Sequence, residues 1–186
     1  YSGTDSNFPL QVGSDNTWTS VSAGDYHSMA LKSDGTLWGW GWGGNGQIGD
    51  GSRQDVHYPI QVGPESTWTS VAAANLHTLA IKSDGSLWAW GYNSGQLGFG
   101  NTNNAFTPVQ VSPGTSWSAV ATGDYHTVAI QFDNTLWTWG RNGSGQLGDG
   151  TNYDNTAPIQ IGSENTWIAA AVGYAHTAAL QSDGTF

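Results

Sequence analysis

The sequence contains no cysteine and very little positive charge. Without cysteine, a disulfide framework and cysteine-ligated metal sites are excluded, while both a cytosol and a bacterial exterior remain compatible. The formal net charge is -10, and the four basic residues are Lys32, Arg53, Lys82 and Arg141. Binding to nucleic acid is therefore not expected, because contact with phosphates needs a basic stripe that these scattered cations cannot form.

Long apolar runs are also missing from the sequence. No stretch approaches the roughly 20 apolar residues of a membrane-spanning helix, so insertion into a membrane is not expected. The 11 tryptophans argue against a disordered chain, since disordered chains have few aromatic residues. The acidic balance and low lysine content favour an extracellular or cell-surface location in a bacterium, with the cytoplasm as the alternative.

What the sequence does contain is a repeat of nearly constant length. Trp18, Trp68, Trp117 and Trp167 are separated by 50, 49 and 50 residues, and a histidine and a proline recur at the same spacing. A fixed period of this size indicates a solenoid, a propeller or an array. We expect one repeat domain over 1–186, divided into a partial blade 1–17, blades 18–67, 68–116 and 117–166, and a partial blade 167–186.

Each repeat predicts four short antiparallel strands. In the first complete copy these are residues 18–23, 27–31, 37–40 and 59–62, the last with a proline that suits an edge strand. Asp34-Gly35 predicts a two-residue type I′ turn, in which both residues have positive φ. Four strands per period without an amphipathic helix predict an all-β fold, a β-propeller of four-stranded blades, with a β-helix as the alternative.

Four motifs follow one another in each repeat. They are Ala-Gly-x-x-His-x-x-Ala-Leu, Asp-Gly-x-Leu-Trp-x-Trp-Gly, Gly-Gln-Leu-Gly-Asp-Gly and Pro-x-x-Val, which in the first copy lie at 23–31, 34–41, 46–51 and 59–62. Their content and order resemble the regulator of chromosome condensation repeat family. The resemblance implies a seven-bladed propeller, of which this chain holds about half. It further implies that the ring is completed by additional blades or by self-association.

Two repeated polar patterns resemble metal-binding sites, but neither has the ligand spacing that a metal site needs. The recurring histidines are His27, His77, His126 and His176. Metal ligands must lie only a few ångströms apart, so we interpret these as structural residues that hydrogen-bond to backbone at the start of a strand. The bends at Asp50 and Asp149 lack the spacing of a calcium loop, and Phe99 replaces the aspartate in the second copy. No metal or other cofactor is expected.

Catalytic patterns are not recognised in the sequence, which has no Gly-x-Ser-x-Gly elbow and no phosphate loop with its lysine. We expect a non-enzymatic scaffold for protein–protein interaction. The alternatives are a carbohydrate-binding module, and guanine-nucleotide exchange on a small GTPase, which the family resemblance implies. The repeated tryptophans are expected in the core, and binding residues in loops that differ between repeats. The candidates are Trp42, Tyr92, Arg141, Arg53, His57, Tyr58, Phe106, Tyr153, Tyr26 and Tyr125.

Overall fold

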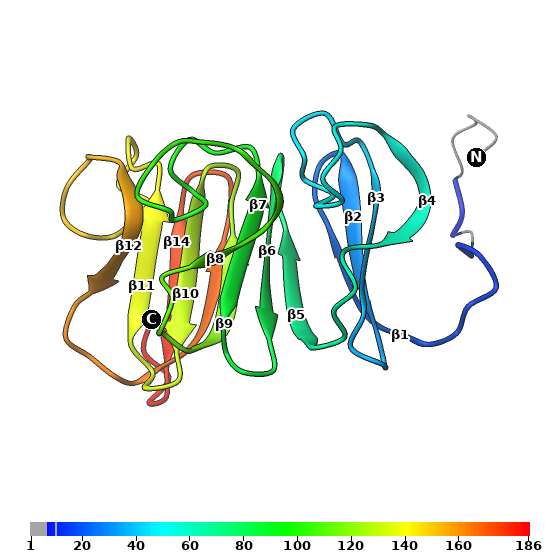
Figure 1. The fold of residues 1–186 in the computed structure, drawn as a ribbon. Helices are drawn as coiled ribbons and strands as arrows, with labels where there is room; N and C mark the ends of the chain where they lie inside the picture. The colour runs from blue at the N-terminus through cyan, green and yellow to red at the C-terminus, as the bar shows by residue number, and fades with distance from the viewer. Residues whose placement is uncertain (1–6, 10) are drawn as a thin grey trace.

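Short β-strands make up the regular structure of the computed structural model, which describes residues 7–9 and 11–186 (Figure 1). The strands are β1 (Trp18–Ala23), β2 (His27–Lys32), β3 (Leu37–Gly41), β4 (Val56–Gln61), β5 (Trp68–Ala73), β6 (His77–Lys82), β7 (Leu87–Gly91), β8 (Ala105–Val111), β9 (Trp117–Thr122), β10 (His126–Gln131), β11 (Leu136–Gly140), β12 (Asn155–Ile161), β13 (Trp167–Val172) and β14 (Thr177–Gln181). Within these ranges of the chain there is no helix that could cross a membrane.

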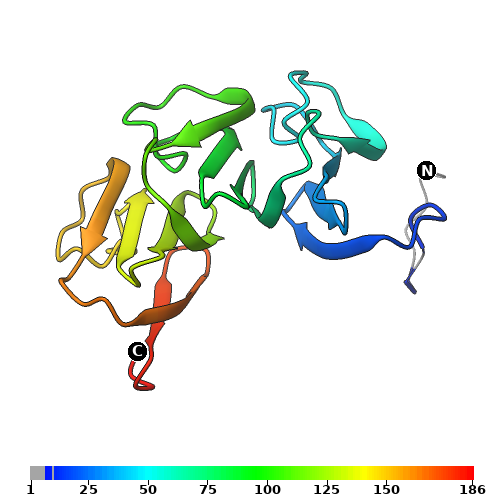
Figure 2. The ribbon, with the colours of Figure 1, turned by 60° about the horizontal axis from the view of Figure 1, so that its bottom comes forward.

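The strands form three four-stranded antiparallel sheets and a two-stranded sheet of β13 and β14, each in chain order. Figure 2 shows the sheets side by side along an arc, with the first strand of each sheet on the inner side of the arc. First strands of neighbouring sheets pack against one another, as do β1 and β5. The predicted all-β propeller fold is confirmed, and the chain forms about half of a ring. The predicted partial blade 1–17 lies partly outside the described residues.

In the first blade, the bounds of three of the four observed strands agree with the predicted bounds to within one residue. β1 matches the prediction, and β2 and β3 each extend by one residue. The fourth strand begins at Val56 instead of Pro59, because Val56 pairs with Gly41 across an irregularity in the ladder. Alternation of side chains is lost at such an irregularity, so the sequence pattern does not reveal this pairing.

The prediction of a two-residue type I′ turn at Asp34-Gly35 is wrong. Gly35 has a φ of 78°, whereas the φ of Asp34 is not positive. The Lys32 amide donates to the Thr36 carbonyl at 3.1 Å, so the loop has three residues and ends in a left-handed one. The Asp34 carboxylate accepts hydrogen bonds from the amide and the hydroxyl of Thr36, which stabilises this longer turn.

The core lies between neighbouring blades and is rich in tryptophan. Trp90, Trp117 and Trp139 are fully buried. Trp68 on the first strand of its blade contacts Trp88 and Trp90 on the third strand, with ring centroids 6.2 and 6.0 Å apart. These large rings fill the space between sheets, so the predicted core position is confirmed for Trp68, Trp90, Trp117 and Trp139. The other repeated tryptophans are only partly buried, namely Trp18, Trp38, Trp40, Trp88, Trp137 and Trp167.

The recurring histidine joins one blade to the next. Its Nε2 lies 2.6–3.1 Å from a threonine hydroxyl of the following blade, in the pairs His27 with Thr78, His77 with Thr122, and His126 with Thr177. The structural role is confirmed, but the predicted backbone partner is wrong, because a side chain of the neighbouring blade takes that place. Burial lowers the pKa of His27 to about 4 and, together with neighbouring histidines, that of His77 to about 3.

Candidate binding surface at the loop end of the blades

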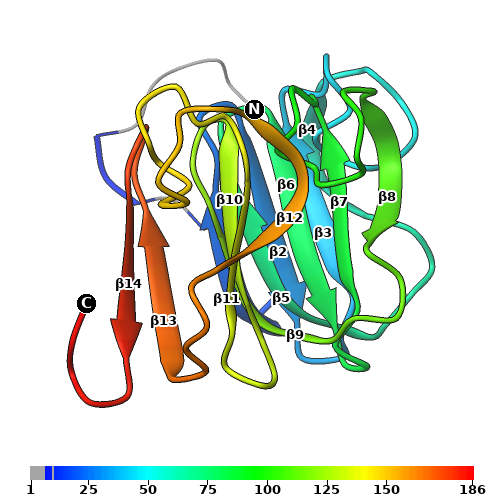
Figure 3. The ribbon, with the colours of Figure 1, turned by 90° about the vertical axis from the view of Figure 1, so that its left-hand side faces the viewer.

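The loops that differ between repeats meet at one end of the blades. Because consecutive strands are antiparallel, the connections after the first and third strands of a sheet leave it at the same end. In the first blade these connections are residues 24–26 and 42–55, and the long ones lie along the upper side of Figure 1. We call this side the loop end, and the opposite side, with the turn at 33–36, the hairpin end. Figure 3 shows the same strands running between these two ends.

Buried amide groups hold the long loops in place. Asn142 is fully buried, and its side chain accepts from the Leu147 amide at 3.0 Å and donates to Asp149 at 3.0 Å. Asn93 is 3% exposed, and its side chain accepts from the Leu97 amide at 3.3 Å and donates to two backbone carbonyls of its loop at 3.0 Å. Asn93 directly follows Tyr92, the first residue of the loop after β7, and Asn142 directly follows Arg141, the first residue of the loop after β11. The loop frame therefore fixes the position from which these two side chains project.

Tyr92, Tyr125 and Arg141 form one group across the second and third blades, which we call the loop-end cluster. The ring centroids of Tyr92 and Tyr125 are 6.4 Å apart at an angle of 79°. The guanidinium of Arg141 lies 5.8 Å from the centroid of Tyr125, within the range of a cation–π interaction. Three residues predicted from the sequence are thus brought together on adjacent loops.

Tyr26 and Trp42 form the corresponding pair in the first blade. Their ring centroids are 5.7 Å apart, and they remain 59% and 38% exposed. A hollow of about 380 Å³ lies beside them and is also lined by Asp25, Asp55 and His57. The hollow therefore combines aromatic faces with carboxylates and an imidazole, which suits a ligand with polar edges or a positive charge.

Four other predicted residues lie farther out on the blades. Arg53 donates from Nε to the Gly44 carbonyl at 3.0 Å, and its guanidinium lies 5.6 Å from the ring of Phe106 in the second blade. Tyr58 on β4 and Tyr153 in the β11–β12 loop are strongly exposed. Among the described residues, no ring contact joins Tyr58 or Tyr153 to the other candidates.

Tyr174 belongs to the loop end although it was not among the predicted binding residues. It is 70% exposed and, with Tyr125 and Arg141, lines a second hollow of about 200 Å³. Tyr174 aligns with Asp25 and Asp124, one residue before Tyr26 and Tyr125, so the variation of this turn between repeats is the signal that marks it.

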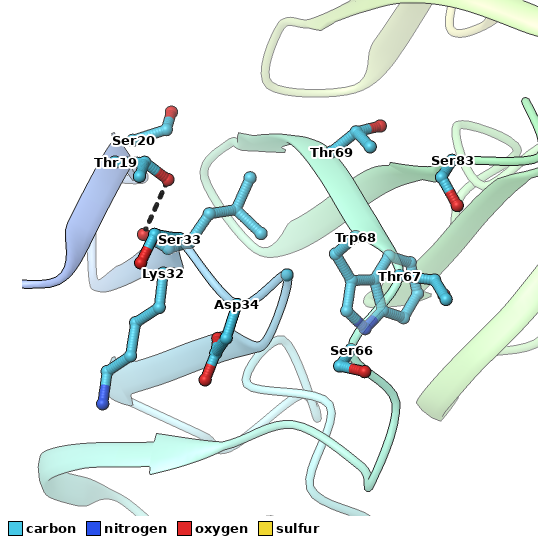
Figure 4. A pocket seen from close by; sticks show the side chains of 12 residues that line it. Thr19, Ser20, Lys32, Ser33, Asp34, Ser66, Thr67, Trp68, Thr69 and Ser83 are labelled. Atoms are coloured by element: carbon cyan, nitrogen blue, oxygen red, sulfur yellow. Dashed lines mark hydrogen bonds between the residues drawn. The ribbon is translucent and has the colours of Figure 1, made fainter.

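A groove at the hairpin end was also not predicted (Figure 4). It has a volume of about 630 Å³ between the first two blades, and most of its lining residues are serine or threonine, including Ser33, Ser66 and Ser83. Its lining comes from separate segments of two repeats, which only the fold brings together. The corresponding place between the second and third blades differs, because Phe132 takes the position that Ser83 has in this groove. The ring of Phe132 lies near Gly85.

Within residues 7–9 and 11–186, no group of three or more histidine, aspartate or glutamate side chains could hold a metal ion. The Asp149 carboxylate accepts from the Thr151 amide and hydroxyl and from Asn142, which lowers the pKa of Asp149. Its oxygens thus serve the loop frame.

Comparison with known families assigns the repeats. The family model for the regulator of chromosome condensation (RCC1) repeat matches residues 34–81, 84–130 and 133–180, and a second model of the same description matches 18–47, 68–96 and 117–146. No curated protein matches the chain.

Solved structures with the same fold include three propellers. Human WBSCR16 is 25% identical with a TM-score of 0.78, over 89% of this chain and 46% of that one. Yeast RCC1 (Prp20), solved with Kap60, is 22% identical with a TM-score of 0.77, over 90% and 43% of the two chains. Prp20p from Saccharomyces cerevisiae, characterised with its binding properties to Gsp1p and histones, is 22% identical with a TM-score of 0.76, over 90% and 45%. This chain thus spans less than half the length of each.

Proposed function

The chain belongs to the regulator of chromosome condensation repeat family, and from that premise we propose that it is a non-enzymatic scaffold whose loop end binds a protein partner. The observation that carries the proposal is the loop-end cluster of Tyr92, Tyr125 and Arg141. Tyrosine, tryptophan and arginine are the residues that contribute most to binding energy at protein interfaces.

The fixed loop frame supports this function. Tyr92 and Arg141 directly follow β7 and β11 and adjoin the buried Asn93 and Asn142, and Tyr125 directly precedes β10. A side chain that is already held in place loses little conformational freedom on binding, so more of the contact energy appears as affinity. Loops presented by a rigid sheet scaffold are also where binding residues are commonly found.

Charge favours a partner with basic residues at its contact surface. The chain has a net charge of -10, and Asp25 and Asp55 line the hollow beside Tyr26 and Trp42. Complementary charge accelerates association and selects the partner. A protein partner also agrees with what is known of Prp20p, a protein of the same fold whose binding to Gsp1p and histones has been studied.

Selection from a random peptide library displayed on phage tests the proposal. Peptides selected on the immobilised chain are expected to bind the parent and to lose at least tenfold in affinity for Tyr125→Ala. Alanine occurs naturally at the equivalent turn of the last repeat, so this variant keeps the blade. The matched control is Phe132→Ser at the hairpin end, where the other repeats carry serine. Selected peptides that bind Tyr125→Ala as tightly as the parent would refute the proposal.

A carbohydrate is the second candidate ligand, and the hollow beside Tyr26 and Trp42 favours it. Exposed aromatic faces stack on sugar rings, and the carboxylates of Asp25 and Asp55 can accept hydrogen bonds from sugar hydroxyls. A glycan array probed with the parent and with Trp42→Ala decides this candidate. Signals that vanish with Trp42→Ala would support it, and an array without signal above background would exclude the sugars it displays.

A further inference from the structure

The groove at the hairpin end lies between two complete four-stranded blades. One wall is the turn after β2, which includes Ser33 and Gly35, and the other is the segment that leads into β5, with Ser66 and Trp68 (Figure 4). The Trp68 amide donates to the Gly35 carbonyl at 3.0 Å, so a hydrogen bond joins the two walls. Because each wall also belongs to an antiparallel sheet, the groove is formed before any ligand arrives.

The groove is open because of a difference between repeats. Gly35 and Gly85 occupy the same repeat position, and so do Ser83 and Phe132. A ring atom of Phe132 would lie 2.9 Å from a Cβ added to Gly85, whereas the nearest atoms at Gly35 belong to Ser66 and Thr67. The space that a phenylalanine ring takes between the second and third blades is therefore free between the first and second.

Hydroxyl groups are the free polar groups of this groove. Seven of its twelve lining residues are serine or threonine. Within the described part of the chain, five of these hydroxyls make no hydrogen bond to protein, and they belong to Ser20, Ser33, Ser66, Thr67 and Ser83. A hydroxyl can donate and accept, and it rotates to suit its partner. The lining thus offers several adaptable partners to a ligand that itself carries both donors and acceptors.

Charged and apolar groups of the lining are already engaged. The Lys32 amine lies 2.6 Å from the Asp15 carboxylate and 3.8 Å from the ring centroid of Trp38. The Asp34 carboxylate accepts from the amide and the hydroxyl of Thr36. Leu31 and Trp68 are each 3% exposed, so they present little apolar surface. A charged ligand finds no unpaired counter-charge in this lining, and an apolar side chain finds no pocket.

We propose that this groove binds an uncharged oligosaccharide. Its many hydroxyls both donate and accept, which matches the free hydroxyls of the two walls. The volume of about 630 Å³ lies within the range of small-ligand sites. The groove and the loop end lie at opposite ends of the blades, so this site does not depend on the protein-binding function proposed above.

An array of linear neutral oligosaccharides of glucose, galactose, mannose, xylose and N-acetylglucosamine, probed with the full chain, tests the proposal. At least one of these sugars is expected to bind, and Ser83→Phe should weaken that binding at least tenfold because the ring fills the groove. Phenylalanine occurs at this position in the third repeat, so the turn accepts it. The matched control is Ser182→Phe, the same change in the turn after β14, which should leave binding as in the parent.

A second variant removes a hydroxyl without adding volume. Ser66→Ala should weaken binding of the same sugar about threefold or more, the loss expected for one hydrogen bond.

Three outcomes would overturn the proposal. They are binding of no neutral sugar, sugar binding that survives Ser83→Phe, and loss of binding on Ser83→Phe for acidic glycans or selected peptides alone. Sugar signals that vanish with Trp42→Ala and persist in Ser83→Phe would belong to the hollow of the first blade. Each of these results leaves the protein-binding function of the loop-end cluster untouched.

Discussion

His77 Nε2 lies 2.6 Å from the hydroxyl of Thr122 and so links the second blade to the third. The imidazole is fully buried, and burial, with His27 and His126 adding to it, lowers the pKa of His77 to about 3. The histidine is therefore neutral in the folded chain at pH 7.

Stability should fall as the pH is lowered from 6.5 toward 4. In this range the unfolded chain binds protons at His27 and His77, whose pKa there is 6.5, while the folded chain does not, because its values are about 4 and 3. At pH 5 the expected loss is about 2 kcal/mol for each of the two residues. Urea unfolding at pH 7.5 and 5.0 measures it. Carboxylates with a lowered pKa, such as Asp34, begin to lose their stabilising effect only as the pH approaches 3.8, so they contribute little at pH 5.0.

Two histidine variants test the cause of this pH dependence. His77→Asn should reduce the difference in unfolding free energy between pH 7.5 and 5.0 by about 2 kcal/mol, because the residue that titrates only in the unfolded chain is gone. His57→Asn on the exposed face of β4 should leave the difference as in the parent. An unchanged difference in His77→Asn would show that other groups carry the pH effect.

Replacing tryptophans by alanine should lower the unfolding free energy much more in the core than on the surface. Trp90 is fully buried and donates to the Gln47 carbonyl, so Trp90→Ala should cost about 3–5 kcal/mol of unfolding free energy. Trp42 is 38% exposed, and Trp42→Ala should cost less than about 1 kcal/mol. Trp40 is only partly buried and should fall between them. Denaturant titration of the three variants decides this, and equal losses would contradict the division between core and loop.

The stabilising contact of a lysine with two tryptophans in the second blade should also form in the third blade when lysine is introduced there. The amine of Lys82 lies 4.0 Å from the centroid of Trp88 and 4.7 Å from that of Trp68. Gln131 occupies the same repeat position and pairs with Trp117. Gln131→Lys should therefore raise the unfolding free energy by about 0.5–1 kcal/mol, the range of a partly exposed cation–π contact. The reverse change, Lys82→Gln, should lower it by a similar amount. A destabilised Gln131→Lys would show that the site does not accept the cation.

Much of this fold follows from the repeat alone. The recurring Trp-x-Trp-Gly segment places its second tryptophan in the core of the second and third blades, where Trp90 and Trp139 are buried as that pattern predicts, while Trp40 in the first blade is partly buried. Local rules were less reliable. The turn at Asp34-Gly35 has a third loop residue, because hydrogen bonds from Lys32 to Thr36 set its length, and such bonds are not visible in residue types.

The site was predicted only as a set of variable positions. Variation between repeats identified Tyr92, Tyr125 and Arg141 one by one, but their contacts cross from one blade to the next. Pairing across blades depends on how far neighbouring sheets are rotated, and spacing along the chain does not contain that information. The same limit explains why Thr122 was not recognised as the partner of His77.

Binding of a protein at the loop end is located most directly by hydrogen exchange. The chain would be measured alone and with a saturating amount of a peptide selected on it. We predict slower exchange in residues 74–76, 92–104, 123–125 and 141–154, which form the loop end of the second and third blades. Protection confined to the turns at 33–36 and 83–86 would place binding at the hairpin end and contradict the account.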